Sequence, residues 1–281
     1  MSFVAVVAVL GLMIGSFLNV VIHRLPIMLQ REWERECAEV LHEESHNEDD
    51  KPFNLITPRS RCPHCEHAIT AWENIPLLSY LLQRGKCTAC GAAISARYPL
   101  VELLTAVLSV AVAVHFGYRW ETGAALLLTW ALIALSVIDL ETTLLPDIIV
   151  LPFLWLGLLI NLNGAFTDIH SAVIGAIAGY LSLWVVYHLF RLLTGKEGMG
   201  YGDFKLLGML GAWMGWHALP LVILLSSVVG AAVGIALIVV KRRGKDVPIP
   251  FGPYLAAAGM ITLLWGNQLT RWYLNLASGP S

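Results

Sequence analysis

Residues 123–140 read GAALLLTWALIALSVIDL, an apolar segment whose one ionisable side chain, Asp139, lies near its end. A helix that spans a membrane needs about 20 predominantly apolar residues, and this segment with its flanks meets that length. Segments of the same character lie at 3–22, 100–117, 148–164, 171–190, 204–219, 220–240 and 253–270. The sequence therefore predicts an all-α polytopic membrane protein with about eight transmembrane helices.

The composition is that of a membrane protein with one polar insert. Of 281 residues, 57% are hydrophobic and 14% are charged, whereas a soluble domain carries roughly 25% charged residues. The mean hydropathy is +0.68. We expect a first transmembrane helix at 1–22, a small inserted domain at 23–99 and a seven-helix transmembrane domain at 100–281. Membrane lipid is the expected surrounding, and we expect no nucleic-acid partner.

The basic residues predict the orientation of the chain. If the insert faces the cytoplasm, eight helices place three later loops on the same side, at 141–147, 191–203 and 241–252. All basic residues except Arg119 and Arg271 then lie in or beside cytoplasmic regions. Short cytoplasmic loops are enriched in Lys and Arg, and the run KRRGK at 241–245 agrees with that rule. The first helix lacks a basic leader and a small-residue cleavage site, so we expect it to be permanent.

Four of the five cysteines form two CxxC pairs, Cys62–Cys65 and Cys87–Cys90. Two such pairs about 20 residues apart are a specific signal for zinc, because each tight turn can present two thiolates to one tetrahedral ion. We therefore expect a structural zinc held by Cys62, Cys65, Cys87 and Cys90, with no position open to substrate. The alternatives are ordinary buried thiols, a redox pair, or a contribution from the two histidines beside the first pair.

Three aspartates, Asp139, Asp147 and Asp203, lie at ends of predicted membrane helices on the cytoplasmic side. Ionisable side chains in membrane segments are costly and indicate function. Two neighbouring carboxyl groups share a proton, so that one acts as base and the other as acid, which suits hydrolysis of an amide by water. The glycines of GYGD at 200–203 let a peptide backbone approach Asp203. The residues alone leave open whether Asp139 or Asp147 is its partner, since Asp147 is also a plausible helix cap.

Several motifs span nearly the whole chain: GSFLNVVIHRLP at 15–26, the CxxC pairs, RYPLVELLTA at 97–106, IDLETTLLPD at 138–147, GMGYGDFKLLGMLGAWMGW at 198–216 and PIPFGPYLA at 248–256. These motifs resemble those of the type IV prepilin peptidase family. The resemblance implies a membrane aspartyl peptidase of the bacterial inner membrane, with its zinc domain and active site facing the cytoplasm. It also implies that Asp139 and Asp203 are the catalytic pair.

The substrates implied by the resemblance are type IV prepilins, type II secretion pseudopilins, or both. Cleavage would follow a Gly and precede a Phe, and the new N-terminus would then be N-methylated from S-adenosylmethionine. The sequence has no GxGxxG fingerprint for that cofactor. Gly85 and Lys86, beside the second CxxC pair, are candidate binding residues, although they equally suit a turn before a zinc ligand. Glu102 is a further candidate, because a carboxylate there suits a cationic amine.

Helix dipoles predict how the two aspartates divide the work. Asp203 lies at a helix N-terminus, which favours a negative charge, and Asp139 lies at a C-terminus, which disfavours it. This reasoning predicts Asp203 as the resting base and Asp139 as the acid.

Two other classes of function also use such residues: a transporter that binds protons or cations at the aspartates, and a non-enzymatic assembly factor that docks through the zinc domain.

Overall fold

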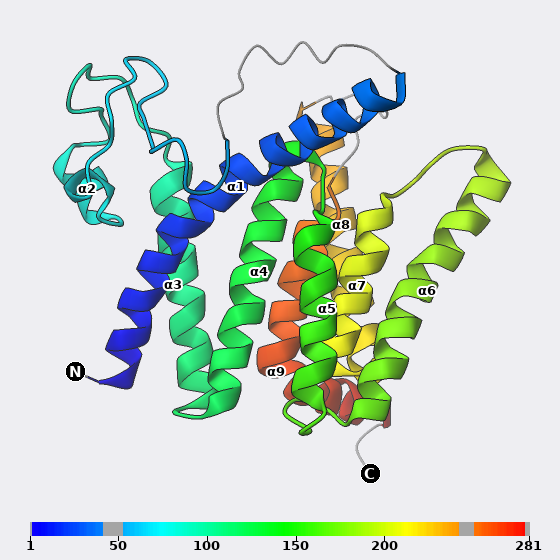
Figure 1. Ribbon diagram of the computed structural model, residues 1–281. Helices are drawn as coiled ribbons and strands as arrows, with labels where there is room; N and C mark the ends of the chain where they lie inside the picture. Colours follow the sequence, from blue (N-terminus) through cyan, green and yellow to red (C-terminus); the bar gives the residue numbers. More distant parts are fainter. Residues whose placement is uncertain (1, 42–52, 242–249, 279–281) are drawn as a thin grey trace. The chain divides into compact units, whose positions relative to one another are not determined.

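The computed structural model describes residues 2–41, 53–241 and 250–278 (Figure 1). Apart from two isolated β-bridges, the regular structure of these residues is helical, which confirms the all-α class. The chain divides into two compact units, unit 1 (Met1–Tyr118) and unit 2 (Arg119–Ser281). The domain boundaries expected at residues 22 and 99 stay a prediction. Residues 242–245 of the basic run lie outside the described residues.

Unit 1 is built on two long helices, α1 (Phe3–Leu41) and α3 (Arg97–Phe116). Two glycines let their backbones approach closely, as is usual between membrane helices. A Cβ on Gly15 would lie 2.7 Å from the Cα of Glu102, and one on Gly11 would lie 2.8 Å from the Cα of Ala106. The polar segment between the helices holds two short elements, η1 (Trp72–Asn74) and α2 (Leu78–Leu82).

Helix α1 is longer than the apolar segment that predicted it. The predicted span ends at residue 22, but the helix continues through Pro26 to Leu41. The added part reads IMLQREWERECAEVL at 27–41 and is rich in strong helix formers such as Leu, Gln, Arg, Glu and Ala. Helix propensity therefore extends α1 beyond its apolar part.

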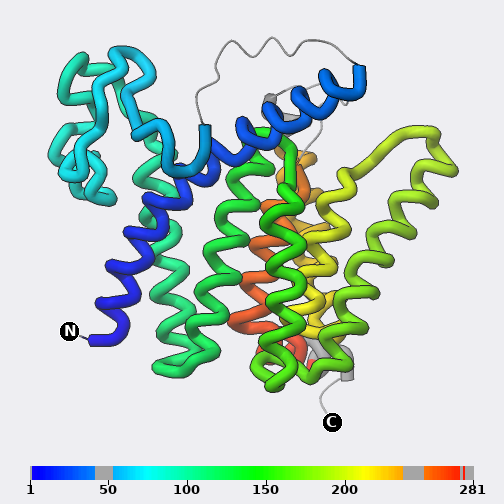
Figure 2. The backbone as a smooth tube through the Cα atoms, in the orientation of Figure 1, coloured from blue at the N-terminus to red at the C-terminus, as the bar shows by residue number. Residues whose placement is uncertain are grey.

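Unit 2 contains the remaining helices (Figure 2). They are α4 (Trp120–Thr142), α5 (Asp147–Asn161), α6 (Ile169–Thr194), α7 (Tyr201–Met214), η2 (Trp216–Ala218), α8 (Leu219–Lys241) and α9 (Gly252–Ser278). The span predicted at 204–219 is therefore interrupted. Gly215, with a φ of 79°, ends α7 in a conformation that favours glycine.

Helix α7 is the buried centre of unit 2 and packs against α5, α6 and α9. Its fully buried side chains are Phe204, Leu206, Leu207, Met209, Leu210, Ala212 and Trp213. Against α6 the contact is made by backbone: a Cβ on Gly179 would lie 2.6 Å from the carbonyl oxygen of Leu207, and one on Gly211 would overlap Gly175. This packing holds the N-terminus of α7 in a defined position.

The end of α5 is tied to the end of α7 by one buried amide, that of Asn161. Its Nδ2 donates to the carbonyl oxygens of Ala212 and Trp213, both at 2.9 Å. Its Oδ1 accepts the backbone N–H groups of Phe166 and Thr167 at 3.0 and 3.2 Å. The side chain thus satisfies backbone groups of two separate segments.

Replacing Asn161 by leucine, which has the same number of side-chain heavy atoms, is expected to lower the free energy of unfolding by about 2 kcal/mol or more, because buried backbone groups lose their partners. Thermal unfolding of the purified protein in detergent measures the loss. Asn163→Leu is the matched control, since Asn163 is exposed. Equal melting temperatures for the two variants would contradict the prediction.

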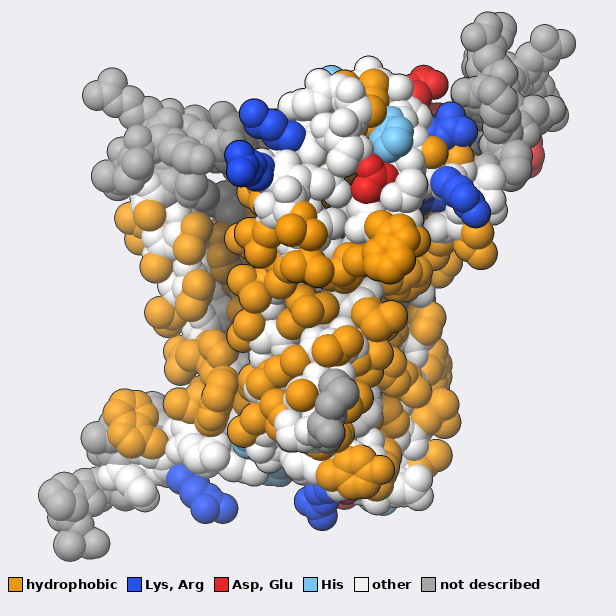
Figure 3. All heavy atoms as spheres, turned by 90° about the vertical axis from the view of Figure 1, so that its left-hand side faces the viewer, with side chains coloured by type: hydrophobic (Ala, Val, Ile, Leu, Met, Phe, Trp, Pro, Cys, Tyr) orange, Lys and Arg blue, Asp and Glu red, His pale blue; other side chains and the backbone are white. Residues whose placement is uncertain are grey.

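Five helical segments within the described residues are long and apolar enough to cross a membrane: α1, α3, α4, α6 and Trp216–Ala236. Helix α5 is apolar but shorter. Figure 3 shows a face of the molecule on which hydrophobic side chains gather in a broad band, with charged side chains gathered at its ends. Outward-facing apolar side chains in such numbers are what a lipid environment requires. The eight crossings stay a prediction.

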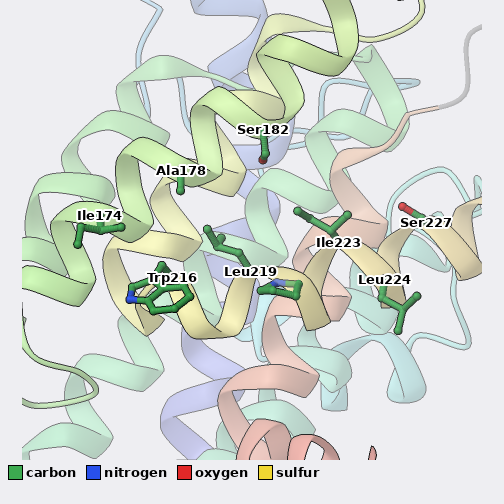
Figure 4. Close-up of a pocket in the computed structure, with 9 residues that line it drawn as sticks. Ile174, Ala178, Ser182, Trp216, Leu219, Ile223, Leu224 and Ser227 are labelled. Atoms are coloured by element: carbon green, nitrogen blue, oxygen red, sulfur yellow. The ribbon is translucent and has the colours of Figure 1, made fainter. Parts of the chain in front are cut away.

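An apolar groove of about 600 Å³ lies beside α6, η2 and α8 (Figure 4). Its lining residues are Ile174, Ala178, Ser182, Trp216, Leu219, Pro220, Ile223, Leu224 and Ser227. The described part of unit 2 therefore has a hollow on its hydrophobic surface, away from the aspartates.

Candidate functional site

Asp139 lies in the last turn of α4 and is 4% exposed. The helix ends at Thr143, which has a left-handed backbone and donates its N–H to the carbonyl oxygen of Asp139 at 2.8 Å. The segment that follows turns back through Leu145 and Pro146 to start α5. The carboxyl group is thereby held inside the protein at the end of an apolar helix.

Asp203 lies in the first turn of α7 and is 6% exposed. The helix starts after Gly200, whose carbonyl oxygen accepts the N–H of Asp203 at 3.3 Å. Gly202 lets this turn pack on the segment after α4, because a Cβ there would lie 2.7 Å from the Cβ of Leu145. The glycines of GYGD therefore have a packing role as well as the predicted role of giving access.

A third element meets the pair: the N-terminus of α9. The backbone N–H of Gly252 donates to Oδ2 of Asp139 at 2.9 Å, in a buried hydrogen bond. A Cβ on Gly252 would lie 2.7 Å from that oxygen and 3.1 Å from Cδ2 of Leu145. Leu145, which is 9% exposed, thus packs between the start of α7 and the start of α9.

The structure distinguishes Asp139 from Asp147. The two carboxyl groups of Asp139 and Asp203 are both buried and close enough to interact electrostatically. Asp147 has a side chain that is 51% exposed, and its oxygens accept bonds from Nζ of Lys205 at 2.6 and 2.8 Å. Asp147 therefore has a cationic partner of its own at the surface, while Asp139 and Asp203 form a buried carboxyl pair.

Two residues of this site were not singled out by the sequence analysis: Leu145 and Gly252. Leu145 is one apolar residue among many in the sequence. Its packing role is seen only in the fold, where it lies against both Gly202 and Gly252. Gly252 precedes Pro253 at the start of a predicted helix, and the available signal was that Leu145 and Gly252 lie within two of the quoted motifs, IDLETTLLPD and PIPFGPYLA. A contact between positions 139 and 252 depends on the fold.

The four predicted zinc ligands come together in unit 1. The Sγ atoms of Cys62 and Cys90 are 3.8 Å apart, those of Cys65 and Cys87 are 4.0 Å apart, and all four ligand atoms lie within 4.8 Å of one another. Zinc–sulfur bonds of about 2.3 Å in a tetrahedron separate the sulfurs by about 3.8 Å. The four-cysteine cluster therefore fits a metal ion such as zinc.

The two CxxC pairs adopt the same local structure. In each, the N–H of the first cysteine donates to the carbonyl five residues later, at 2.9 and 2.8 Å. The residue that follows the second cysteine has a positive φ in both, 57° for Glu66 and 73° for Gly91. A β-bridge closes each turn, Arg61 with Ala68 and Lys86 with Ala93. The four-cysteine cluster is thus an internal repeat.

Glu73 joins the two repeats. Its carboxylate accepts the N–H and the hydroxyl of Thr70, both at 2.8 Å, and the hydroxyl of Thr88, which lies inside the second CxxC pair. His67, beside the first pair, contacts it at 3.3 Å through Nε2. These bonds, that of Thr88 first, lower the pKa of Glu73 to about 2. Glu73 lies outside the motifs quoted from the sequence.

Replacing Glu73 by glutamine is expected to speed the loss of metal from the cysteine cluster at neutral pH, because the bonds that join the repeats lose their ionic acceptor. The folded pKa lies below the ordinary value near 4.5, so the carboxylate contributes fully above that pH and less as the pH falls toward 2. Release of zinc to a coloured chelator measures the rate. Glu66→Gln, in the same module, is the control, and equal rates in the two variants would contradict the prediction.

The three predicted methyl-donor residues also lie in unit 1. Gly85 has a φ of 68° and packs on Tyr80, and its N–H donates to the carbonyl oxygen of Tyr80 at 2.9 Å. Lys86 donates its N–H to Gln83 at 3.1 Å and is exposed. The backbone N–H groups of Gly85 and Lys86 are therefore used within this turn, and the side chain of Lys86 is exposed.

Glu102 is 8% exposed on α3. Its Oε2 accepts the N–H of Leu77 at 2.8 Å, where the backbone of Leu77 has a φ of 57°, and the hydroxyl of Ser16 also lies beside it. On the facing helix, Oδ1 of Asn19 is buried with no hydrogen-bond partner, while its Nδ2 donates to the carbonyl of Tyr98 at 3.0 Å. Buried acceptors of this kind suit a cationic ligand group.

Comparison with known proteins covers most of the chain. The bacterial peptidase A24 N-terminal domain matches residues 9–116, and the type IV leader peptidase family matches residues 126–235. No solved structure matches the chain.

The relatives in these comparisons bear the name prepilin leader peptidase/N-methyltransferase. The protein of Aeromonas hydrophila is 63% identical over 96% of this chain and 93% of its own length. That of Stutzerimonas stutzeri is 60% identical over 99% and 96%, and that of Pseudomonas aeruginosa is 58% identical over 99% and 95%. The chain therefore belongs to the type IV leader peptidase family.

Proposed function

We propose that the chain is a bifunctional prepilin leader peptidase and N-methyltransferase whose peptidase uses Asp139 and Asp203. The observation that carries the peptidase assignment is the buried carboxyl pair, formed where α4 ends and α7 begins. Such a pair shares one proton and supplies both a base and an acid. The names of the relatives support the pairing of this activity with methyl transfer.

In the proposed peptidase reaction the ionised carboxyl takes a proton from water as the water oxygen attacks the scissile carbonyl carbon. The protonated carboxyl gives its proton to the carbonyl oxygen, and a tetrahedral diol forms. The diol then loses its proton to the second carboxyl while the nitrogen takes the proton held by the first, and the C–N bond breaks. Each carboxyl thus returns to its starting state.

The proposed substrates are type IV prepilins, type II secretion pseudopilins, or both, cut after Gly and before Phe. Support comes from the resemblance of the motifs and from the names of the relatives. The placement of the pair also suits a substrate whose cleavage site lies at the edge of the membrane, because Asp139 and Asp203 lie at helix ends. We place the chain in the bacterial inner membrane with eight crossings.

The proposed orientation puts the cysteine cluster and both aspartates on the cytoplasmic side. The distribution of basic residues supports it, since only Arg119 and Arg271 would lie on the other side. In this arrangement the leader of a substrate and the peptidase site share one compartment, which is also where a cytoplasmic methyl donor is available.

A zinc ion held by Cys62, Cys65, Cys87 and Cys90 has a structural role in this proposal. The sulfur spacing fits a tetrahedral ion, and a four-thiolate site leaves no position for substrate. The repeated turns and the Glu73 bonds hold each half of the site in a defined shape.

For the methyl transfer we propose that Gly85, Lys86 and Glu102 contribute to the site for S-adenosylmethionine and the acceptor amine. S-adenosylmethionine supplies the methyl group. Glu102 offers a buried carboxylate to a cationic centre, and the exposed ammonium of Lys86 suits a carboxylate of the donor. Gly85 is needed for the turn itself, because its φ of 68° and its contact with Tyr80 exclude a side chain.

One experiment tests the proposal against both alternatives. The purified chain in lipid vesicles is given a prepilin that retains its leader, with and without S-adenosylmethionine, and the products are analysed by mass spectrometry. We expect leader loss under both conditions and one added methyl group only with the donor. Ion flux without cleavage would instead support a transporter, and neither flux nor cleavage would support an assembly factor.

A further inference from the structure

The start of α9 contacts the carboxyl pair directly. The N–H groups of the first helical turn have no partner within their own helix, and that of Gly252 is satisfied by Oδ2 of Asp139 at 2.9 Å. The bond is buried and joins positions far apart in the chain. Helix α9 has no acidic residue in its own first turn, so Asp139 supplies the carboxylate at this helix end. The bond fixes Oδ2 of Asp139 and leaves Oδ1 for the reaction.

The contact also changes the electrostatic surroundings of Asp139. Its own helix presents a negative dipole end, but the N-terminus of α9 presents a positive one. A hydrogen bond donated to a carboxylate is stronger when the carboxyl is ionised. The bond thus offsets the dipole of α4 at Asp139, so that the two carboxyl groups both lie beside a helix N-terminus, Asp139 at that of α9 and Asp203 at that of α7.

Among the described residues around the pair, no cation beside Asp203 stabilises its ionised form in the way that the bond from Gly252 stabilises that of Asp139. Lys205, on the same turn of α7, is bonded to Asp147 at the start of α5. The other described charged residues of α4 are Glu121, in its first turn, and the exposed Glu141. Arg271 lies far along α9 from Gly252. The Asp203 carboxyl meets a backbone N–H of its own turn, that of Gly200, whereas the N–H that bonds Asp139 comes from a separate helix, α9.

We infer that the N-terminus of α9 is a third component of the peptidase site, and that Gly252 is a positioning residue that holds Asp139 through its backbone N–H. The inference rests on the proposed function, since it assigns Asp139 to the catalytic pair. Glycine is required because any side chain at this position would start 2.7 Å from the bonded oxygen. The cheapest adjustment to a larger residue is a shift of the Asp139 carboxyl group.

Gly252→Ala tests the inference, with prepilin cleavage by the full chain in lipid vesicles as the assay. A displacement of about 1 Å at a catalytic group can lower the rate about 100-fold, and we expect kcat to fall by about that factor with KM unchanged. Gly259→Ala is the matched control: it also places a methyl group in the same helix 2.7 Å from the end of a side chain, that of Leu210. We expect it to retain the wild-type kcat.

Two outcomes would overturn the inference. The first is a kcat for Gly252→Ala equal to that of the Gly259→Ala control. The second is a double variant, Gly252→Ala with Leu145→Val, whose kcat equals that of Leu145→Val alone. The loss in Gly252→Ala would then be explained by crowding of the Leu145 side chain. Asp139→Asn separates these results from failure of the proposed function: if that variant cleaves normally, the catalytic pair itself is wrong, whatever Gly252→Ala does.

Discussion

Asp139→Asn and Asp203→Asn are each expected to lower leader cleavage by at least about 10³-fold, because an amide can neither accept the proton of water nor supply one. The two groups act as a unit, so the double variant is expected to be no worse than either single one. Both side chains are buried and nearly isosteric with asparagine, which limits structural damage. The rate of prepilin cleavage in membranes measures the effect.

Asp147→Asn is the matched control for these variants. Asp147 lies at the start of α5, is half exposed and bonds to Lys205, and exposed ion pairs contribute little to stability. We expect it to retain most of the cleavage activity. Full activity in Asp139→Asn, or a loss in Asp147→Asn as large as that in Asp139→Asn, would contradict the assignment of the pair.

The second large effect is expected at the cysteine cluster. Cys62→Ser and Cys87→Ser each remove one thiolate from a site whose four ligand atoms lie within 4.8 Å of one another. Binding of a structural zinc contributes about 10–16 kcal/mol to small domains that depend on it. Each variant is therefore expected to lose bound zinc and to become sensitive to protease within the polar segment of unit 1.

Metal analysis of the purified protein and the pattern of protease cleavage measure this effect. Cys37→Ser is the control, because Cys37 is an exposed cysteine on α1 outside the cluster. It is expected to retain both metal and protease resistance. Bound zinc at the wild-type level in Cys62→Ser would show that the four thiolates do not share one ion.

Much of the helical structure could be predicted, because apolar length is a local property of the sequence. Residues 123–140 and α4 (Trp120–Thr142) coincide almost completely. The ends of two helices, α1 and α7, differ from the predicted ends for local reasons that hydropathy does not measure. Helix α1 continues to Leu41 through strong helix formers, and α7 stops at Met214 because Gly215 leaves the helical conformation.

The candidate site shows where sequence reasoning ends. The CxxC spacing predicted the cysteine cluster, since each pair is a local turn with a known geometry. The residues alone left Asp139 and Asp147 open, and the resemblance of the motifs favoured Asp139; the fold adds that Asp139 is buried while Asp147 bonds to Lys205 at the surface. The expected division of work between acid and base depended only on the dipole of the helix to which each aspartate belongs. It could not include α9, whose start reaches Asp139 from position 252.

The two proposed activities belong to separate compact units. The carboxyl pair lies in unit 2, whereas Gly85, Lys86 and Glu102 lie in unit 1. Substitutions in one unit are therefore expected to leave the reaction of the other largely intact. The two reactions also have a fixed order, cleavage first and methylation second. The amine that is methylated exists only after the leader has been removed.

The repeated turns of the cysteine cluster have a consequence for how this region can vary between relatives. Each turn closes on itself, through its own β-bridge and its own backbone hydrogen bonds. The chain between the turns contributes no cysteine, so the part of it that follows Glu73, whose carboxylate bonds to Thr70 and Thr88, is free to change in length as long as both turns can reach one ion. Insertions and deletions should accumulate there during evolution, while the two turns themselves stay constant in length.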